Sequence, residues 1–285
     1  MDNCEYDLIV KVDDEILSPN YKYKIIDILG KGVSGQVFCC RREIDNKLFA
    51  IKIIRNKVAY STQALMELKI LELLNLQIDP KDEYHIIRKH DHFIYKKHTC
   101  IVFELLDLNL YDLLKKNHHS GLTLKTISYL IKDVLEAVYH VHKINIIHTD
   151  IKPENVLLKI EKEVNVNKIT VKLTDFGSAC YKNNTFNKYI QSRYYRSPEV
   201  LIGYPYGFSI DIWSVGCIAA ELFLGNPIFA GVCEYEQLFQ IVNFFKEIPY
   251  YFVIGDKAKK YMDFKETGCT FKSPEQYFKV HYLII

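Results

Sequence analysis

Several common signals are missing from this sequence of 285 residues. None of its eight cysteines forms a Cys-x-x-Cys pair, and no histidine cluster adds zinc-ligand spacing. The longest apolar run, near Trp213, is bounded by Asp211 and Glu221, which leaves it far short of the roughly 20 residues that a membrane-spanning helix needs. These absences argue against a structural zinc site, a dithiol redox centre and a membrane span, and they favour reduced thiols in an intracellular protein.

A strong excess of charge of one sign is missing as well. Subtracting 35 acidic from 37 basic side chains leaves a formal charge of +2, which is too small to indicate nucleic acid or a membrane surface as the partner. The first ten residues carry Asp2, Glu5 and Asp7, where an export signal would need positive charge followed by an apolar run. We therefore expect a protein of the cytoplasm, the nucleus or both, with no nucleic acid and no membrane as partner.

The apolar side chains that a folded core needs are present. Hydrophobic residues make up 49% of the chain and charged residues 25%, as in soluble globular proteins. Short β-branched and aromatic runs predict strands at 24–29, 36–40 and 48–54, a helix at 63–76, and two more strands at 93–95 and 100–105. The N-terminal part of the chain is thus expected to be mostly β.

After residue 106 the sequence becomes mostly helical in pattern. Apolar residues at helical spacing predict a long amphipathic helix at 123–143, and two further helices are expected at 209–224 and 235–245. The segment 159–168 is rich in Lys, Glu and Asn, which predicts an exposed loop between two short strands.

Two features of the N-terminal part could bind phosphates. The run Gly30 to Val37 carries glycines between two predicted strands, so its backbone could approach phosphate groups closely. Taken alone this pattern is weak, and a glycine-rich hairpin without a ligand explains it as well. Lys52 on the third strand and Glu67 on the following helix could pair, so that Glu67 fixes a lysine that holds phosphates, although an isolated surface ion pair is the competing interpretation.

The decisive motifs are His148 to Asn155 and, after a predicted strand, Asp175 to Gly177. With the Gly-rich run, the lysine and the glutamate they follow the order found in eukaryotic protein kinases, which the chain resembles. The resemblance implies an α+β, bilobal protein-kinase fold. A small β-rich N-lobe with one main helix is expected over residues 1–106, with a hinge near 104–106, and a larger helical C-lobe over 107–285, together forming one kinase domain.

The resemblance also implies roles for individual residues and two cofactors, ATP and Mg²⁺. Asp150 is expected to accept or steer the proton of the substrate hydroxyl, and Lys152 to neutralise the γ-phosphate. Asn155 and Asp175 are expected to hold the metal, since their oxygens are hard ligands. The implied ATP-binding residues are Leu29, Gly30, Lys31, Gly32, Val33, Ser34, Gly35, Gln36, Val37, Ala50, Lys52, Glu67, Phe103, Glu104 and Leu106. The expected partners are protein substrates, and the expected state is a monomer.

A narrower resemblance lies in the segment Tyr189 to Glu199, which is similar to the activation segment of DYRK and YAK kinases in the CMGC group. It implies a dual-specificity kinase that modifies Ser and Thr of other proteins and autophosphorylates Tyr189. A phosphate there would add about −1.5 to −2 charge beside Arg193 and Arg196. The His-Thr-Asp at 148–150 also occurs in CLK and SRPK kinases, so a kinase of that kind stays open as an alternative.

The end of the chain differs from the kinase pattern. After the helix expected at 235–245, the sequence stops at Ile285 where a kinase C-lobe normally has further helices, and its last residues, 282–285, are apolar. We therefore expect a C-lobe that lacks its last helices, and Glu199 without a visible arginine partner. A kinase-like scaffold or binding module, inactivated by truncation, is thus the alternative to an active kinase, although the complete set of catalytic residues argues against it.

Overall fold

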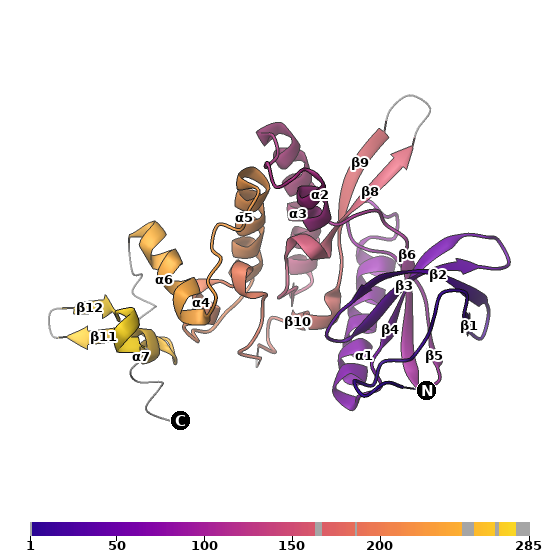
Figure 1. Ribbon diagram of the computed structural model, residues 1–285, viewed down its shortest axis with the longest axis horizontal. Helices are drawn as coiled ribbons and strands as arrows, with labels where there is room; N and C mark the ends of the chain where they lie inside the picture. The colour runs from indigo at the N-terminus through magenta and orange to yellow at the C-terminus, as the bar shows by residue number, and fades with distance from the viewer. Residues whose placement is uncertain (1, 163–166, 186, 247–253, 266–267, 278–285) are drawn as a thin grey trace. The chain divides into compact units, whose positions relative to one another are not determined.

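The computed structural model describes residues 2–162, 167–185, 187–246, 254–265 and 268–277 of the chain (Figure 1). The chain forms two compact units. The first comprises Met1–Leu110 and Asn155–Ala179, and the second comprises Tyr111–Glu154 and Cys180–Ile285. The lobe boundary at residue 106 stays a prediction.

A six-stranded antiparallel sheet forms the centre of the first unit (Figure 1). Its strands follow the spatial order β1-β2-β3-β4-β6-β5. Their bounds are β1 Glu15–Leu17, β2 Lys22–Lys31, β3 Gly35–Arg42, β4 Leu48–Ile54, β5 Lys89–Tyr95 and β6 His98–Glu104. The five predicted strands are confirmed as β2 to β6. The sequence did not reveal β1, because three residues are too few to show an alternation.

The two faces of this sheet are covered by different parts of the chain. Side chains alternate between the faces along each strand. Ile51 of β4 lies in a buried core with Leu8 and Ile16 of the N-terminal segment. The next residue of β4, Lys52, therefore points to the opposite face, where it is bonded to Glu67 of α1, Val58–Glu72. The N-terminal segment and α1 thus lie on opposite faces of the sheet.

The helix predicted at 63–76 is confirmed, but its start lies earlier. α1 begins at Val58, and the helix continues as a π-helical turn, η1, over Leu73–Ile78. Lys57 precedes the helix without a side-chain capping hydrogen bond, and the first turn carries no acidic residue. Since both usual start signals are missing, no local pattern indicated that the helix begins there.

The π-helical turn positions a buried amide. Asn75 lies within η1, and its Nδ2 donates to the carbonyl oxygen of Ile87 at 3.0 Å while its Oδ1 accepts from the backbone N–H of Lys89 at 2.8 Å. The guanidinium of Arg88 donates to the carbonyl oxygen of Asn75 at 3.0 Å and lies 3.3 Å from the carboxylate of Asp79, which follows the turn. The end of the helix is thereby attached to the start of β5.

One loop prediction is wrong. The hairpin of β8, Val156–Lys162, and β9, Asn167–Leu173, takes up most of the segment 159–168 that we expected to be a loop. Apolar residues alternate with polar ones at Leu158, Ile160, Ile169 and Val171, so both strands continue beyond the buried part of the hairpin. Residues 163–166 lie outside the described part of the chain.

The second unit is mostly helical (Figure 1). The bounds of its helices are α2 Leu110–Lys116, α3 Leu124–Lys143, α4 Pro198–Leu201, α5 Ser209–Leu224, α6 Glu234–Phe245 and α7 Ala258–Tyr261. Two short strand pairs accompany them, β7 Ile146–Ile147 with β10 Cys180–Tyr181, and β11 Met262–Lys265 with β12 Gly268–Phe271. The helices predicted at 123–143, 209–224 and 235–245 are confirmed, and so is the α+β class.

Local signals explain where the long helices begin and end. The hydroxyl of Thr123 accepts from the N–H of Thr126 at 3.3 Å and caps α3. Gly225 ends α5 with a φ of 83°, a left-handed conformation that favours glycine. The apolar stretch at 282–285 lies outside the described residues.

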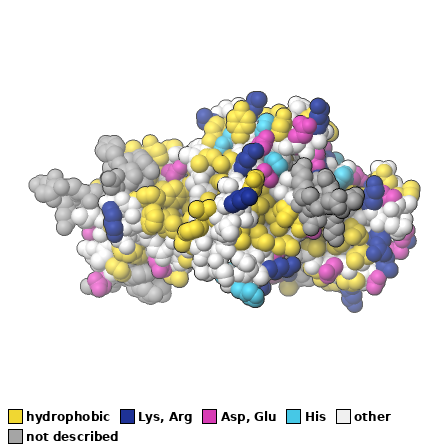
Figure 2. Space-filling model, turned by 90° about the horizontal axis from the view of Figure 1, so that it is seen from above, with side chains coloured by type: hydrophobic (Ala, Val, Ile, Leu, Met, Phe, Trp, Pro, Cys, Tyr) yellow, Lys and Arg dark blue, Asp and Glu magenta, His cyan; other side chains and the backbone are white. Residues whose placement is uncertain are grey.

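The surface carries charges of both signs. On the face shown in Figure 2, basic and acidic side chains are interspersed among apolar ones. Among the described residues, no helix combines the length and the apolar composition that crossing a membrane requires.

Candidate active site

The Gly-rich run forms a tight hairpin between β2 and β3. The N–H of Gly32 donates to the carbonyl oxygen of Gly35 at 2.8 Å, and Gly30 lies opposite Val37. A Cβ atom on Gly35 would lie 2.1 Å from the carbonyl oxygen of Ile53 on β4. Only glycine therefore allows the hairpin to run this close to the next strand.

Strand register shows which predicted ATP-binding side chains share a face. Val37 lies opposite Lys52, and Ala50 lies opposite Phe103. Residues that face each other across two strands point to the same side of a sheet, as do residues two apart on one strand. Val37, Ala50, Lys52 and Phe103 therefore line one face of the sheet.

Two predicted ATP-binding residues point the other way. Lys31 pairs with Gln36, and Gln36 pairs with Ile53, whose side chain belongs to the core on the N-terminal side. Their side chains thus lie on the face opposite to Lys52. Of these two residues, only the backbone can contribute to a nucleotide site on the Lys52 face.

The predicted hinge residue Glu104 has a contact that the sequence did not suggest. Its carboxylate accepts from the N–H of Arg88 at 2.8 Å and from Nζ of Lys172 at 2.5 Å. Lys172 is buried and also pairs with Asp82 at 2.6 Å. Leu106 beside it is half-buried, and Leu29 and Val33 are exposed. The carboxylate of Glu104 is thus held by a buried lysine from β9.

Lys52 is the centre of a charged triad within the first unit. Its Nζ lies 2.9 Å from each carboxylate oxygen of Glu67 and 2.8 Å from Oδ1 of Asp175. Lys52 and Glu67 are both buried. Burial by itself would lower the pKa of Lys52, but the carboxylates of Asp175 and Glu67 outweigh it and hold that pKa above its usual value. Lys52 is therefore a fixed cation.

The residues after Asp175 support this triad. Asp175 has a left-handed backbone, with φ at 59°, and the next side chain, Phe176, is fully buried. A Cβ atom on Gly177 would lie 3.2 Å from Oδ1 of Asp175 and 3.3 Å from Oε2 of Glu67. The amide of Gln63 on α1 donates to the carbonyl oxygen of Gly177. A larger residue at position 177 would crowd the charged groups.

The residues present fit a magnesium ion. The carbonyl oxygen of Asn155 accepts from the N–H of Thr174 at 2.9 Å and from its hydroxyl at 3.1 Å, so the stretches that carry Asn155 and Asp175 are joined within the first unit. Both side chains offer oxygen atoms, and the Asp175 side chain is 44% exposed. Mg²⁺ is usually held by one or two such side chains together with phosphate oxygens. Among the described residues, no group of three or more His, Cys, Asp or Glu could hold a metal ion.

Asp150 lies in the second unit with two partners on its carboxylate. Its Oδ2 is 2.7 Å from Nζ of Lys152. Its Oδ1 accepts from the hydroxyl of Ser192 at 2.8 Å and from the Ser192 N–H at 3.0 Å. Lys152 also donates to that hydroxyl at 3.1 Å. The two predicted catalytic residues are therefore together, and Ser192 is a third member to which the sequence assigned no role.

The backbone before Asp150 is held by a buried carboxylate. Asp211, on α5, accepts from the N–H of His148 at 2.8 Å and from the N–H of Thr149 at 2.9 Å. The ring of His142 lies 2.8 Å from the same carboxylate. Thr149 has a φ of 69°, which is unusual for a β-branched residue. An acidic residue near the start of a mostly apolar helix was the signal of this support in the sequence.

Two of the predicted regulatory residues, Tyr189 and Arg196, lie in contact in the second unit. The ring of Tyr189 is 69% exposed, and the guanidinium of Arg196 lies 4.5 Å from its centroid. Arg196 is buried, donates to the carbonyl oxygen of Ile190 at 2.9 Å and pairs with Glu234 at 3.0 Å. Arg193 donates to the carbonyl oxygen of Val232 at 2.6 Å.

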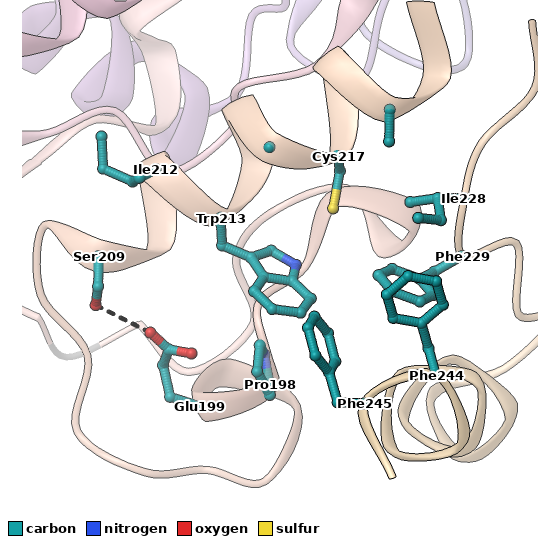
Figure 3. A pocket seen from close by; sticks show the side chains of 12 residues that line it. Pro198, Glu199, Ser209, Ile212, Trp213, Cys217, Ile228, Phe229, Phe244 and Phe245 are labelled. Carbon is teal, nitrogen blue, oxygen red and sulfur yellow. Dashed lines mark hydrogen bonds between the residues drawn. The ribbon is translucent and has the colours of Figure 1, made fainter. Parts of the chain in front are cut away.

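Glu199, which was expected to lack an arginine partner, is bonded to a serine. Glu199 is half-buried, and its carboxylate accepts from the hydroxyl of Ser209 at 3.0 Å (Figure 3). It lies at a cavity of about 550 Å³, whose aromatic side is formed by Trp213 and phenylalanines of α6 and the preceding loop (Figure 3). A hydroxyl at the start of α5 thus provides the compensating contact.

Comparison with known proteins identifies the family. The protein kinase domain family matches residues 23–270. The chain belongs to the protein kinase family. This kinase domain is 50% identical over 85% of its length to the probable serine/threonine-protein kinase yakA of Dictyostelium discoideum. It is 43% identical over 92% of its length to the dual specificity protein kinase YAK1 of Saccharomyces cerevisiae.

A human relative belongs to the neighbouring branch. The kinase domain is 44% identical over 76% of its length to human dual specificity tyrosine-phosphorylation-regulated kinase 4. The predicted kinase fold and the predicted DYRK/YAK resemblance are both confirmed. The chain spans 16%, 32% and 41% of the lengths of the three relatives. Protein kinase domains act on protein substrates with ATP, typically together with Mg²⁺.

Proposed function

We propose that this chain is an active kinase that transfers the γ-phosphate of ATP to Ser and Thr hydroxyls of proteins and to its own Tyr189. One observation carries the proposal: the Lys52 ammonium is bonded to Glu67 and to Asp175 at the same time. A kinase needs this lysine and this aspartate in place together for phosphoryl transfer. In this chain the lysine and the aspartate are bonded at 2.8 Å.

The residues of the first unit would bind and neutralise the nucleotide. The glycine hairpin offers backbone N–H groups to the phosphates, and Lys52 holds the α- and β-phosphates while Glu67 fixes its flexible side chain. Asn155 and Asp175 would hold Mg²⁺, which when bound offsets the charge that develops on the phosphate oxygens. Ala50, Val37 and Phe103 supply the apolar surface for the adenine ring.

The residues of the second unit would act on the acceptor hydroxyl. Ser192 already donates its hydroxyl proton to Asp150 at 2.8 Å, the kind of hydrogen bond that a substrate serine or threonine would make. Lys152, 2.7 Å from the same carboxylate, can neutralise the γ-phosphate. Asp150 thus orients the hydroxyl and accepts its proton.

The arrangement around Tyr189 supports autophosphorylation as a regulatory step. The phenol is exposed and lies against Arg196, and Nε of Arg193 is buried without a hydrogen-bond partner among the described residues. A phosphate on Tyr189 could therefore form charge-assisted hydrogen bonds with the guanidinium of Arg196, which already lies beside the ring. A peptide mass spectrum of the purified, fully active protein with unmodified Tyr189 would refute this part of the proposal.

Phosphotransfer to a generic basic protein tests the activity. We expect phosphate incorporation by the wild type and a loss of at least about 10²-fold in Asp150→Asn, which keeps the shape but removes the proton acceptor. Asp256→Asn is the matched control, because Asp256 forms an exposed ion pair with Lys188 in the same unit. Equal, background-level signals from all three proteins would instead support a scaffold or binding module.

We also propose that the chain works inside the cell and as a monomer. Cysteines 4, 39, 40, 100, 180, 217 and 233 are free thiols. Free thiols are typical of a reducing compartment. Light scattering of the purified protein tests the monomer, and imaging of a fluorescently tagged chain tests the location. A dimer at micromolar concentration would contradict the first statement, and secretion of the tagged chain would contradict the second.

A further inference from the structure

The segment Asp2–Leu8 has a fixed shape against the sheet. Oδ1 of Asn3 accepts from the N–H groups of Glu5 and Asp7, both at 2.9 Å, and the N–H of Asn3 donates to the carbonyl oxygen of Asp7 at 2.9 Å. Leu8 is buried in the core beneath the sheet. This turn holds the carboxylate of Asp7 in a position that is only 2% exposed.

Asp7 joins two cations that flank the Gly-rich hairpin. Nε of Arg55 donates to its Oδ1 at 2.7 Å, and Nζ of Lys31 lies 3.1 Å from its Oδ2. Glu5 contributes a second carboxylate, 2.8 Å from Lys31 and 3.3 Å from Arg55. Lys31 is the last residue of β2, and Arg55 directly follows β4. One buried carboxylate thus connects the two strands on either side of β3.

The same two cations belong to the hairpin or are bonded to it. Lys31 lies inside the Gly-rich run itself. The backbone N–H of Arg55 donates to the carbonyl oxygen of Ser34, at the tip of the hairpin, at 2.9 Å. A glycine-rich hairpin has little stiffness of its own, because its glycines allow many backbone conformations. The position of the hairpin therefore depends on contacts made from outside it, and Asp7 supplies them on both sides.

We propose that the segment Asp2–Leu8 is a clamp that sets the position of the Gly-rich hairpin, with Asp7 and Lys31 as positioning residues for nucleotide binding. The Lys31 side chain lies on the face opposite to Lys52, so it acts through the hairpin backbone and does not touch the nucleotide. Holding the hairpin in place removes conformational freedom that binding would otherwise have to remove, and this raises nucleotide affinity. The effect on nucleotide rests on the proposed function, whereas the effect on the hairpin does not.

Replacing Lys31 tests the clamp, and the same strand supplies a matched control. In Lys31→Met the hairpin loses its direct tie to Asp7. In Lys24→Met, β2 loses an ion pair at its other end, because Nζ of Lys24 lies 2.8 Å from Asp13, which follows the segment Asp2–Leu8 and is more exposed than Asp7. Both variants are measured for ATP dissociation constant, KM for ATP, kcat, thermal unfolding and amide hydrogen exchange of residues 32–35.

We expect Lys31→Met to raise the ATP dissociation constant and KM about fivefold, the size of one partly buried ion pair, with a smaller change in kcat. Its hairpin amides should exchange faster even without nucleotide. Lys24→Met should match the wild type in each of these, and Lys31→Arg, which keeps the ion pair, should restore the wild-type values. Asp7→Asn, which removes the charge that both cations share, should have at least the effect of Lys31→Met.

Two results would overturn the clamp. In the first, Lys31→Met and Lys24→Met have the same ATP dissociation constant and the same rate of amide hydrogen exchange at residues 32–35. In the second, both lysine variants lose the same amount of ATP affinity, which would mean that the ion pairs of β2 stabilise the sheet as a whole. A wild type that binds no ATP refutes the proposed function alone. In that case, faster hairpin exchange in Lys31→Met supports the clamp, and unchanged exchange overturns it.

Discussion

In the first unit the charged side chains of the candidate site form ion pairs with one another. In the second unit the buried carboxylate of Asp211 instead accepts hydrogen bonds from the backbone that precedes Asp150. Lys52, Glu67 and Asp175 form a triad of direct ion pairs. Asp150 and Lys152, by contrast, pair with each other, and the loop before them is held by backbone hydrogen bonds to Asp211. In the first unit the residues proposed to act in the reaction also support one another. In the second unit the supporting residue, Asp211, is a different residue from Asp150 and Lys152.

This difference predicts how activity and stability should respond to substitutions in each unit. In the first unit, removing a supporting charge also removes a group that the proposed reaction uses. In the second, Asp211 can be removed while Asp150 and Lys152 remain. If the comparison holds, activity and stability should fall in different proportions in the two units.

The largest effect is expected from Lys52→Met, which removes the cation of the triad. We expect kcat/KM to fall about 10²- to 10³-fold, because preorganised charge that faces the phosphates is lost. Steady-state kinetics measure the change, and thermal unfolding shows whether the fold is kept. Lys47→Met, at an exposed turn, is the control. If Lys52→Met retained activity within threefold of the wild type, the triad would not be the functional group of the first unit.

Asp211→Asn is expected to have the next largest effect, and it affects stability first. The amide offers one acceptor oxygen in place of two, so one buried N–H of His148 or Thr149 loses its partner. The free energy of unfolding should fall by about 1–3 kcal/mol, and kcat should fall because Asp150 moves. Urea unfolding measures the first quantity. Unchanged stability in Asp211→Asn, compared with the surface control Asp256→Asn, would break the comparison between the units.

The smallest effect is expected from Glu221→Gln, which tests a buried pair within the second unit. The hydroxyl of Tyr195 donates to Glu221 at 2.6 Å, and burial raises the pKa of Glu221 above its usual value although this hydrogen bond opposes the shift. An acid with a raised pKa in the folded state binds its proton more tightly there than in the unfolded chain. It therefore destabilises the fold as the pH rises through that pKa.

Glu221→Gln should remove this loss because glutamine can still accept the Tyr195 hydroxyl and does not ionise. We expect the difference in free energy of unfolding between pH 5 and pH 8 to shrink by about 1 kcal/mol relative to the wild type. Urea unfolding at both pH values measures it. A larger difference in the variant would mean that the charged form of Glu221 is stabilised by the fold, which would contradict the raised pKa of Glu221.

The sequence revealed the residues that occur in short, ordered motifs. Lys52, Asp150 and Asp175 each lie in such a motif, and alternation or helical spacing placed most of the strands and helices around them. What the motifs did not reveal are contacts between segments far apart in the chain. Asp211 with Thr149 and Lys172 with Glu104 are pairs of this kind, and neither member signals its partner locally.

The wrong or missing elements also have physical reasons. The hairpin of β8 and β9 was taken for a loop over 159–168 because its outer part carries many charges, yet cross-strand pairing continues through it. The start of α1 was missed because Lys57 provides no cap. Lys31 stays a predicted ATP-binding residue through its backbone, because strand alternation turns its side chain to the face opposite Lys52, which its place in the Gly-rich run did not indicate.

The π-helical turn at Leu73–Ile78 determines how the fold should respond to the deletion of a residue there. A π-helical turn accommodates an extra residue in a helix, and removing one residue rotates everything that follows by about 100°. A single-residue deletion there would restore regular helix but would turn Asp79 away from Arg88, to which it is bonded. A deletion in this turn should therefore destabilise the fold, because the turn sets the rotation between α1 and the residues that contact the start of β5.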